Sequence, residues 1–462
     1  MLPLPTTRLN LILFPFRLDP MADRATSSPL RIACYGFADS QAGSVSTAGN
    51  FILRQLLARG HRIDFFNKSS FVRPRDLEGL ANYQYIDVPT PRFDRLMQNW
   101  PRWGGEILRH LIGQIAHRVF AGGIMREMRR RHAEQPYDVQ LWLGDWAWGR
   151  LRDVPVVSWV QGPPETDARS IVRHKRQFRE LCGLRSYLPL RAYAAYRGTV
   201  GLPRFDHTDL FIVGSAWSRE FLSGYGISPE AIHALPYPTD LKQFSPADDE
   251  APAADRPTVL WLGRTVPRKR LDLFLGACAQ LIQGGRDIDV FAVGGFDFAP
   301  GYARLIEQFP APSRLRYIRN LPREQVVPLL RAASVVVQPS EDENFGSAIA
   351  EALACGTPVV LGPTNGTADY IGGGGVRFAQ YDVSCVAEAI GSVLDNTARL
   401  RRPAREAAER WFNPERVTDD LILLLHRAIL KTGRVNFVAD EIEDESAAAD
   451  SSTAETPSTV SV

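Results

Sequence analysis

The sequence of 462 residues lacks several features that would place a protein in a class at once. Its five cysteines lie far apart and form no CxxC pair, so neither a disulfide framework nor a zinc site is indicated. Separate thiols of this kind are typical of a cytoplasmic protein. No apolar run is long enough to span a bilayer. The formal net charge of +2 excludes a polycation that binds nucleic acid through its overall charge, and we expect no nucleic-acid partner.

The dinucleotide-binding fingerprint GxGxxG is also missing from the place where it would be expected. A strand predicted over 31–37 is followed by a Gly/Ser-rich loop over 39–46, a helix over 51–58 and a strand over 62–66. This βαβ order predicts a parallel, doubly wound sheet. Because its first loop lacks the fingerprint, a hydride-transfer function loses its main support.

A chain of this length is expected to form two or three domains. Both halves alternate strands with helices, which predicts the α/β class with two Rossmann-like doubly wound domains facing a cleft. The predicted order is a disordered leader over 1–30, a first domain over 31–246, an acidic linker over 247–257, a second domain over 258–410, a last helix over 411–433 and a disordered acidic tail over 434–462. We interpret residues 1–20 as an upstream extension or a disordered leader rather than a targeting signal.

The most informative stretch of the second domain reads PSEDENFGSAIAEALACGTP over 339–358. A strand leads into a polar loop, and a helix of small residues begins at Gly346. Glu343 lies before this helix and Glu351 within it, so Glu351 keeps roughly the heading of the helix entrance. Helix N-termini bind anions. The pattern therefore indicates a ligand that carries both phosphate and hydroxyl groups; the alternative is a solvated acidic loop.

A second cluster follows the strand that opens the same domain. Gly263 and Arg264 come at the strand's carboxyl end, and Lys269 follows five residues later. Ligands of open α/β sheets bind beyond the carboxyl ends of the strands. Arg264 can grip phosphate oxygens bidentately and Lys269 adds a point charge, so the pair could neutralise a diphosphate without a metal. A basic surface loop is the alternative interpretation.

These residues resemble a known family, the retaining GT-B glycosyltransferases of family 4. The resemblance rests on Gly263-Arg264 with Lys269, on ENFGSAIAEALACGTPVV, and on PYPTDLKQFSP over 236–246. It covers roughly residues 31–430 and is specific in the carboxyl half. It implies an enzyme that moves a sugar from a nucleotide-sugar donor to a saccharide, lipid-linked or small-molecule acceptor, in polysaccharide or glycoconjugate biosynthesis. The donor is a co-substrate, and neither a cofactor nor a metal is implied.

The resemblance also implies roles for single residues. Arg264 and Lys269 would bind the diphosphate and stabilise its departing charge, Glu343 would face the donor sugar, and Glu351 would hold the ribose. Further donor contacts are implied for Gly263, Asn344, Phe345, Gly346 and Ser347, with the base near Arg319 and Leu321, and acceptor-side contacts for Gly43 and Gln161. The last helix would cross back onto the first domain, and no protein base would be required.

The sequence departs from the family pattern at three positions. Gln161 stands where many relatives carry a histidine, which leaves the acceptor-side contact open. Arg270 replaces a common glycine after the lysine, and Asn344 replaces a common glycine after the first glutamate.

Two basic, aromatic-containing blocks, 92–131 and 169–197, allow three interpretations. They could be a solvated arginine face, a surface for anionic lipid head groups at the inner face of a membrane, or a groove for an acceptor or a nucleic acid. Asp287-Ile288-Asp289 matches a metal motif of the other glycosyltransferase fold, but it precedes its strand and so lies on the wrong side of the sheet. Two alternative functions also stay open: a hydrolase or epimerase of nucleotide sugars, and a catalytically silent binding scaffold.

Overall fold

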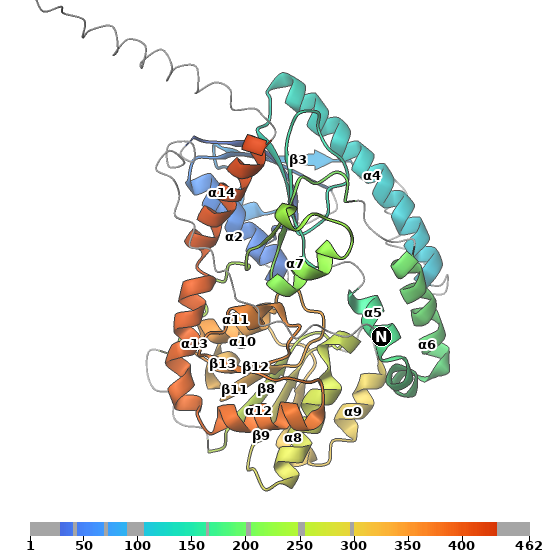
Figure 1. The fold of residues 1–462 in the computed structure, drawn as a ribbon, viewed down its shortest axis with the longest axis vertical. Coiled ribbons are helices and arrows are strands. Elements are labelled where there is room, and N and C mark those ends of the chain that lie inside the picture. Colours follow the sequence, from blue (N-terminus) through green and yellow to red (C-terminus); the bar gives the residue numbers. More distant parts are fainter. Residues whose placement is uncertain are drawn as a thin grey trace, which may run out of the picture.

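The computed structural model describes residues 28–39, 44–68, 73–89, 106–162, 166–199, 205–247, 255–295 and 300–431. Two parallel sheets with flanking helices form two lobes, one above the other in Figure 1. The predicted leader up to residue 27, most of the predicted linker, the predicted tail and Gly43 lie outside the described residues.

The amino-terminal lobe contains a seven-stranded sheet in the order β3-β2-β1-β4-β5-β6-β7. Its strands are β1 (Arg31–Gly36), β2 (Arg62–Lys68), β3 (Tyr83–Val88), β4 (Val139–Leu143), β5 (Val156–Trp159), β6 (Leu210–Val213) and β7 (Ile232–Ala234). Its helices include α2 (Ser44–Ala58), α4 (Glu106–Glu134) and α7 (Ala216–Ser223). All neighbouring strands are parallel, and every residue of β4 and β5 is buried, as expected for strands covered on both faces.

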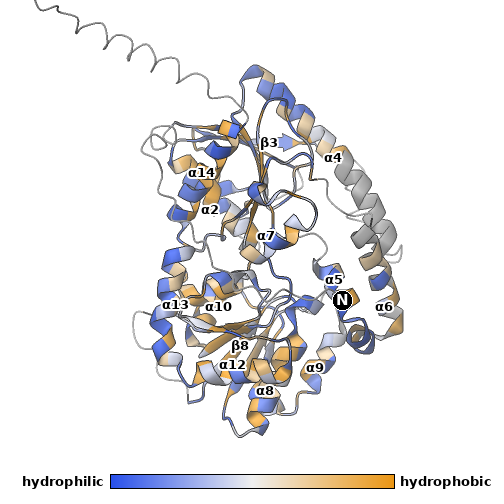
Figure 2. Cartoon of the chain, in the orientation of Figure 1, coloured by the Kyte–Doolittle hydropathy of each residue, from blue (hydrophilic) through white to orange (hydrophobic). Residues whose placement is uncertain are grey.

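The carboxyl-terminal lobe contains a six-stranded parallel sheet in the order β10-β9-β8-β11-β12-β13. Its strands are β8 (Thr258–Leu262), β9 (Asp289–Val293), β10 (Leu315–Ile318), β11 (Val335–Gln338), β12 (Val359–Leu361) and β13 (Gly375–Arg377). Its helices are α8 (Leu271–Gln283), α9 (Ala303–Glu307), α10 (Arg323–Ala332), α11 (Ser347–Ala354), α12 (Val383–Leu394) and α13 (Thr397–Trp411). Figure 2 shows hydrophobic strands around β8 inside the lobe and hydrophilic residues on the outer helix α13. The prediction of two doubly wound α/β domains is confirmed.

The last helix, α14 (Pro414–Lys431), returns from the lower lobe to pack against α2 of the upper one (Figure 1). An ion pair of 2.7 Å between Arg59 Nη2 and Asp419 Oδ1 accompanies this contact. Trp411 ends α13 instead of opening the last helix, because Pro414 starts a new one. Asn413 Oδ1 accepts from the N–H of Glu415 at 2.9 Å and so satisfies an otherwise unpaired donor at the start of that helix.

One segment leaves the amino-terminal sheet and packs on the other lobe. The helices α5 (Thr166–Arg173) and α6 (Lys175–Thr199) follow β5, and Figure 1 shows α5 beside the lower lobe. Ile171 of α5 and Phe178 of α6 are buried in the same apolar cluster as Trp261 of β8. Burial of these side chains attaches the segment to the carboxyl-terminal lobe.

Candidate active site

The two clusters singled out in the sequence meet at one edge of the carboxyl-terminal sheet. The strands β8 and β11 are neighbours, with Val259 opposite Val335. Gly263 and Arg264 follow β8, and the short 3-10 helix η4 (Pro267–Lys269) ends at Lys269. The loop over 339–346, which we name the donor loop, follows β11. Its Glu343 forms an ion pair with Lys269, so a contact between side chains joins the two clusters.

Glu343 is buried and has a second cation beside it. Arg268 Nη1 lies 2.6 Å from its Oε2. Burial by itself would raise the pKa of Glu343, but the charges of Arg268 and Lys269 outweigh burial and lower it. The carboxylate is therefore ionised at neutral pH. The pKa of Lys269 is also lowered, because burial and the neighbouring guanidinium groups outweigh the attraction of Glu343.

Arg264 differs from these paired cations. Its side chain is exposed, and it forms no ion pair with another described residue. Its charge nevertheless reaches Lys269, whose pKa it helps to lower. The guanidinium is thus a cation that an anionic ligand could meet without first displacing a carboxylate among the described residues.

The donor loop passes into α11 through a glycine that no larger residue could replace without a shift. A Cβ at Gly346 would lie 2.6 Å from Gln338 Oε1 and 2.9 Å from Thr367 Oγ1. Its N–H donates to Thr367 Oγ1 at 2.8 Å. Ser347 begins α11, and Glu351 lies partly buried in the next turn of that helix. Arg319 and Leu321 follow β10, at the same sheet edge but beyond β9 in the strand order.

Asn344 and Phe345 contact the amino-terminal lobe. Asn344 Oδ1 accepts from the N–H of Gly214 at 3.0 Å, and the residue is buried. The ring of Phe345 lies 5.3 Å from that of Tyr237 and 5.5 Å from that of Phe412. The side chain of Asn344 is thus bonded across the domain boundary, so any donor contact would come from its backbone. The hydrogen bond to Gly214 also gives the asparagine side chain a role at a position where glycine is common.

On the amino-terminal side, Gln161 is exposed just after β5. It lies against Gly144, since a Cβ there would be 2.8 Å from Gln161 Nε2. Gly144 has a φ of +85°, a left-handed conformation that favours glycine. Gln161 therefore sits at the carboxyl edge of the amino-terminal sheet, where the acceptor side was predicted.

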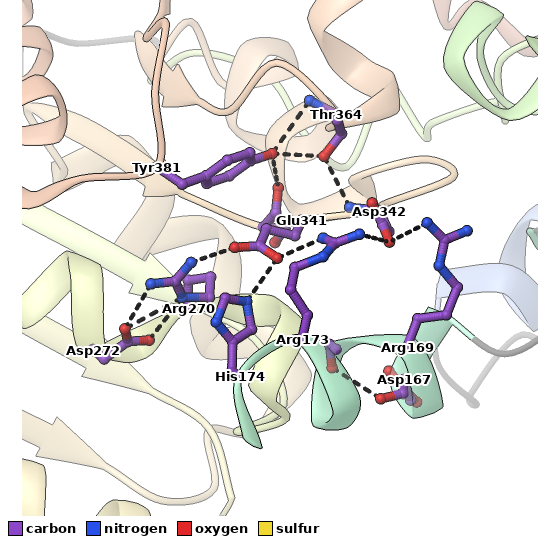
Figure 3. Close-up of polar contacts among 12 residues, drawn as sticks. Asp167, Arg169, Arg173, His174, Arg270, Asp272, Glu341, Asp342, Thr364 and Tyr381 are labelled. Carbon is purple, nitrogen blue, oxygen red and sulfur yellow. Dashed lines mark hydrogen bonds and ion pairs between the residues drawn. The ribbon is translucent and has the colours of Figure 1, made fainter. Parts of the chain in front are cut away.

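A network of ion pairs around the donor loop was not foreseen from the sequence (Figure 3). The carboxylate of Glu341 accepts from Arg173 Nη1 at 2.7 Å, pairs with His174 Nε2 at 2.8 Å, and contacts Arg270. Burial would raise the pKa of Glu341, but the hydrogen bond with His174 and the charge of Arg270 outweigh it and lower the pKa to about 2. Glu341 thus stays ionised although it is buried.

The neighbouring Asp342 has a left-handed φ of +51°, and its N–H donates to Thr364 Oγ1 at 2.9 Å. Its carboxylate lies 3.0 Å from Arg173 Nη2 and 3.5 Å from Arg169 Nη2. Asp167 of α5 completes the network by pairing with Arg268 at 2.6 Å. The only sequence signal was that an acidic run, SEDEN, and a basic run, ARSIVRHKR, carry opposite charge.

Arg270 shows why glycine is common at its position. Its φ of +47° is left-handed, a conformation that costs a non-glycine residue free energy. In this chain the guanidinium pairs with Glu341 and, at 2.9 Å, with Asp272. These contacts offset the backbone cost.

The aspartates of the Asp287-Ile288-Asp289 motif pair with arginines away from the donor loop. Asp287 lies 3.0 Å from Arg256 and also pairs with Arg314, which lies 3.6 Å from Asp289. The motif stands at the start of β9, the edge opposite to the donor loop. Across the described ranges no three His, Cys, Asp or Glu side chains gather as a metal would require.

The carboxyl-terminal lobe matches a known family. Residues 246–411 match the family described as Glycosyl transferases group 1. This range includes Arg264, Lys269, the donor loop and α11, so the geometry described above lies in the part of the chain that matches this family.

Curated relatives agree with this assignment for part of the chain. D-inositol 3-phosphate glycosyltransferase 1 of Catenulispora acidiphila is 31% identical over 235 residues, covering 46% of this chain and 56% of the relative. The D-inositol 3-phosphate glycosyltransferase of Mycobacterium tuberculosis is 32% identical over 239 residues, covering 48% and 50%. The chain therefore spans about half the length of the curated relatives it matches.

Solved structures match most of the chain. A sucrose-phosphate synthase from Thermosynechococcus elongatus superposes with a TM-score of 0.64 at 20% identity, covering 87% of this chain and all of that one. Anabaena HepE in complex with UDP-glucose gives 0.53 at 15% identity, covering 87% and 99%. WaaG, a glycosyltransferase involved in lipopolysaccharide biosynthesis, gives 0.55 at 18%, covering 85% and 99%. These likenesses show that the fold is GT-B.

The low pKa of Glu341 predicts a pH-dependent contribution to stability. A carboxylate whose pKa is lowered on folding stabilises the fold above its ordinary pKa, and this stabilisation is lost as pH falls toward the folded value. Glu341→Gln should therefore melt below wild type at neutral pH, and the gap should shrink between about pH 5 and about pH 2.

Melting curves recorded across this range by circular dichroism would check the prediction. Glu180→Gln is the matched control, because Glu180 is exposed and, within the described ranges, its ion-pair partner is Arg176 on its own helix. A gap for Glu341→Gln that does not change with pH would contradict the assignment.

Proposed function

We propose that the chain is a retaining glycosyltransferase that moves a sugar from a nucleotide-sugar donor to a hydroxyl group of an acceptor. The observation that carries this proposal is the ion pair between Lys269 and Glu343, which joins the two predicted clusters at one sheet edge. The family match over the same residues supports it. Retention follows from the resemblance to family 4.

The chemistry assigns a task to each part of the site. Cleavage of the bond between sugar and nucleotide develops negative charge on the diphosphate. The exposed Arg264, the nearby Lys269 and the N–H groups at the start of α11 would stabilise that charge, each by a few kcal/mol. Glu343 would face the donor sugar and Glu351 the ribose. The departing phosphate would help to deprotonate the acceptor, and neither a protein base nor a metal is assigned a step.

The names of similar proteins indicate which donors and acceptors to test first. Structures of Anabaena HepE hold UDP and UDP-glucose, which makes UDP-sugars the first donors to test. The curated relatives are named for D-inositol 3-phosphate, so a phosphorylated polyol joins saccharides and lipid-linked sugars among the acceptors to test.

The experiment that tests the function measures nucleoside diphosphate release. The purified chain is incubated with a panel of nucleotide sugars, with and without the acceptor panel. Release that depends on an acceptor supports a transferase, and release without one supports a hydrolase. Absence of any product from any donor would favour a silent binding scaffold.

Two substitutions test the assigned roles. Lys269→Ala removes a cation that meets the developing charge, and Glu351→Ala removes the proposed ribose contact. Each should reduce kcat/KM by about a hundredfold or more while the chain still folds. Lys269→Ala should also melt below wild type, because it removes one of the two buried cationic partners of Glu343. Arg256→Ala, at the opposite sheet edge, is the matched control. Near-wild-type kinetics of either site variant would overturn its assignment.

We also propose a peripheral contact with an anionic membrane surface through the outer side of α5 and α6. Residues 92–105 of the other basic block, 92–131, lie outside the described residues. No helix in the described ranges has the length and apolar composition needed to cross a bilayer. Val172, Leu184 and Leu188 are 55%, 60% and 56% exposed. Exposed cations, Lys175, Arg176 and Arg179, come from the same helices. Arg169 and Arg173 are not counted in this surface, because they pair with Asp342 of the donor loop.

Flotation with phosphatidylserine-containing vesicles tests the contact. The wild type should float at low salt and lose binding as salt rises, since the lipid attraction is electrostatic. Leu184→Ser with Leu188→Ser should weaken flotation, whereas Leu80→Ser, an exposed leucine ahead of β3, should leave it unchanged. A wild type that does not float at low salt would refute the contact.

A further inference from the structure

The donor loop contains three consecutive acids immediately before the helix proposed to bind a diphosphate. The side chains of Glu341, Asp342 and Glu343 are only 3%, 4% and 9% exposed. A buried carboxylate that lacks a partner is costly, and each of these has at least two cationic or hydrogen-bonding partners. A site that must accept an anionic ligand therefore depends on how completely these charges are compensated.

The side chains that compensate these carboxylates, arginines, a lysine and the imidazole of His174, come from two different parts of the chain. Arg268, Lys269 and Arg270 follow β8 within the same lobe. Arg169, Arg173 and His174 come from α5 and the residue after it. Among the described residues, both ion-pair partners of Asp342 belong to this second group. Compensation of Asp342 thus depends on a helix that follows a strand of the amino-terminal sheet.

Arg173 is the centre of the second group (Figure 3). Its Nη1 donates to Glu341 at 2.7 Å and its Nη2 to Asp342 at 3.0 Å, so one planar guanidinium spans two carboxylates. An arginine can make this fork-like contact, whereas the single ammonium of a lysine cannot reproduce its geometry.

The position of α5 does not depend on Arg173 alone. Ile171 and Phe178 are buried against the carboxyl-terminal lobe, and the ring of Phe178 lies 6.4 Å from that of Tyr302. Asp167 adds an ion pair with Arg268. Removal of the Arg173 side chain would therefore change the charge around the donor loop and leave the helix in place.

We propose that Arg173 is a positioning residue for donor binding. It neutralises Glu341 and Asp342 and holds the donor loop so that the diphosphate can approach Arg264 and Lys269 without an uncompensated carboxylate beside it. Like charges repel more strongly where burial lowers the local dielectric constant, as it does around these acids. Arg173 acts through the two acids rather than by touching the ligand. The inference rests on the proposed function, because the anion is taken to be the donor's diphosphate.

Calorimetric titration with UDP, and with GDP and ADP as further probes, tests the inference. Arg173→Met should weaken binding of the preferred nucleotide about tenfold or more. Arg173→Lys should fall between, because it restores the charge and not the fork. In the Arg173→Met background, Asp342→Asn should recover most of the affinity, since it removes the carboxylate left with only the more distant Arg169 as an ion-pair partner among the described residues.

Arg402→Met is the matched control, because Arg402 is 88% exposed on α13 and, among the described residues, its ion-pair partner is the exposed Glu406 on its own helix. Its affinity should equal that of wild type. In steady-state kinetics Arg173→Met should raise the KM for the donor more than it lowers kcat.

The outcomes separate the inference from the function on which it rests. Equal affinity of Arg173→Met and wild type, or a loss that Asp342→Asn does not recover, overturns the role of Arg173 and leaves the proposed function standing. A wild type that binds none of the three nucleotides overturns both.

Discussion

The ion pairs of Glu343 with Arg268 and Lys269 are the constraint on which the rest of the site depends. They tie the loop after β8 to the loop after β11, and they keep a buried carboxylate ionised. Arg268 then extends the link to Asp167 of α5. One buried acid thus connects two strand ends of one sheet with a helix that follows a strand of the other.

Such a network is better understood as a device for specifying geometry than as a source of stability. Removing ions from water costs much of what their attraction returns, so buried pairs contribute little net free energy, whereas loss of one partner is expensive. Alternative arrangements of the donor loop would leave Glu341 or Asp342 without partners. The network therefore favours a single arrangement of the loop, with α11 starting from Gly346 below it.

The fold and one half of the site could be predicted from the sequence because they depend on local patterns. Strands buried on both faces are continuous apolar runs, and the ends of neighbouring parallel strands place Arg264, Lys269 and Glu343 at one edge. The pairing of Arg173 with Asp342 could not be predicted, because opposite charges 169 positions apart contain no information on register. The roles of Asn344 and Arg270 likewise depend on partners that only the folded chain supplies.

The packing of α5 and α6 on the carboxyl-terminal lobe has a consequence for how domains of proteins with this fold can be exchanged. A chimera joined at the predicted linker would combine the donor loop with a foreign helix in place of α5. That foreign helix would have been selected to pair with other acids. The apolar surface around Trp261 would also meet side chains of a different shape. The part of the chain proposed to recognise the donor is thus discontinuous in the sequence: it consists of the carboxyl-terminal lobe together with residues 166–199 from the other half of the gene.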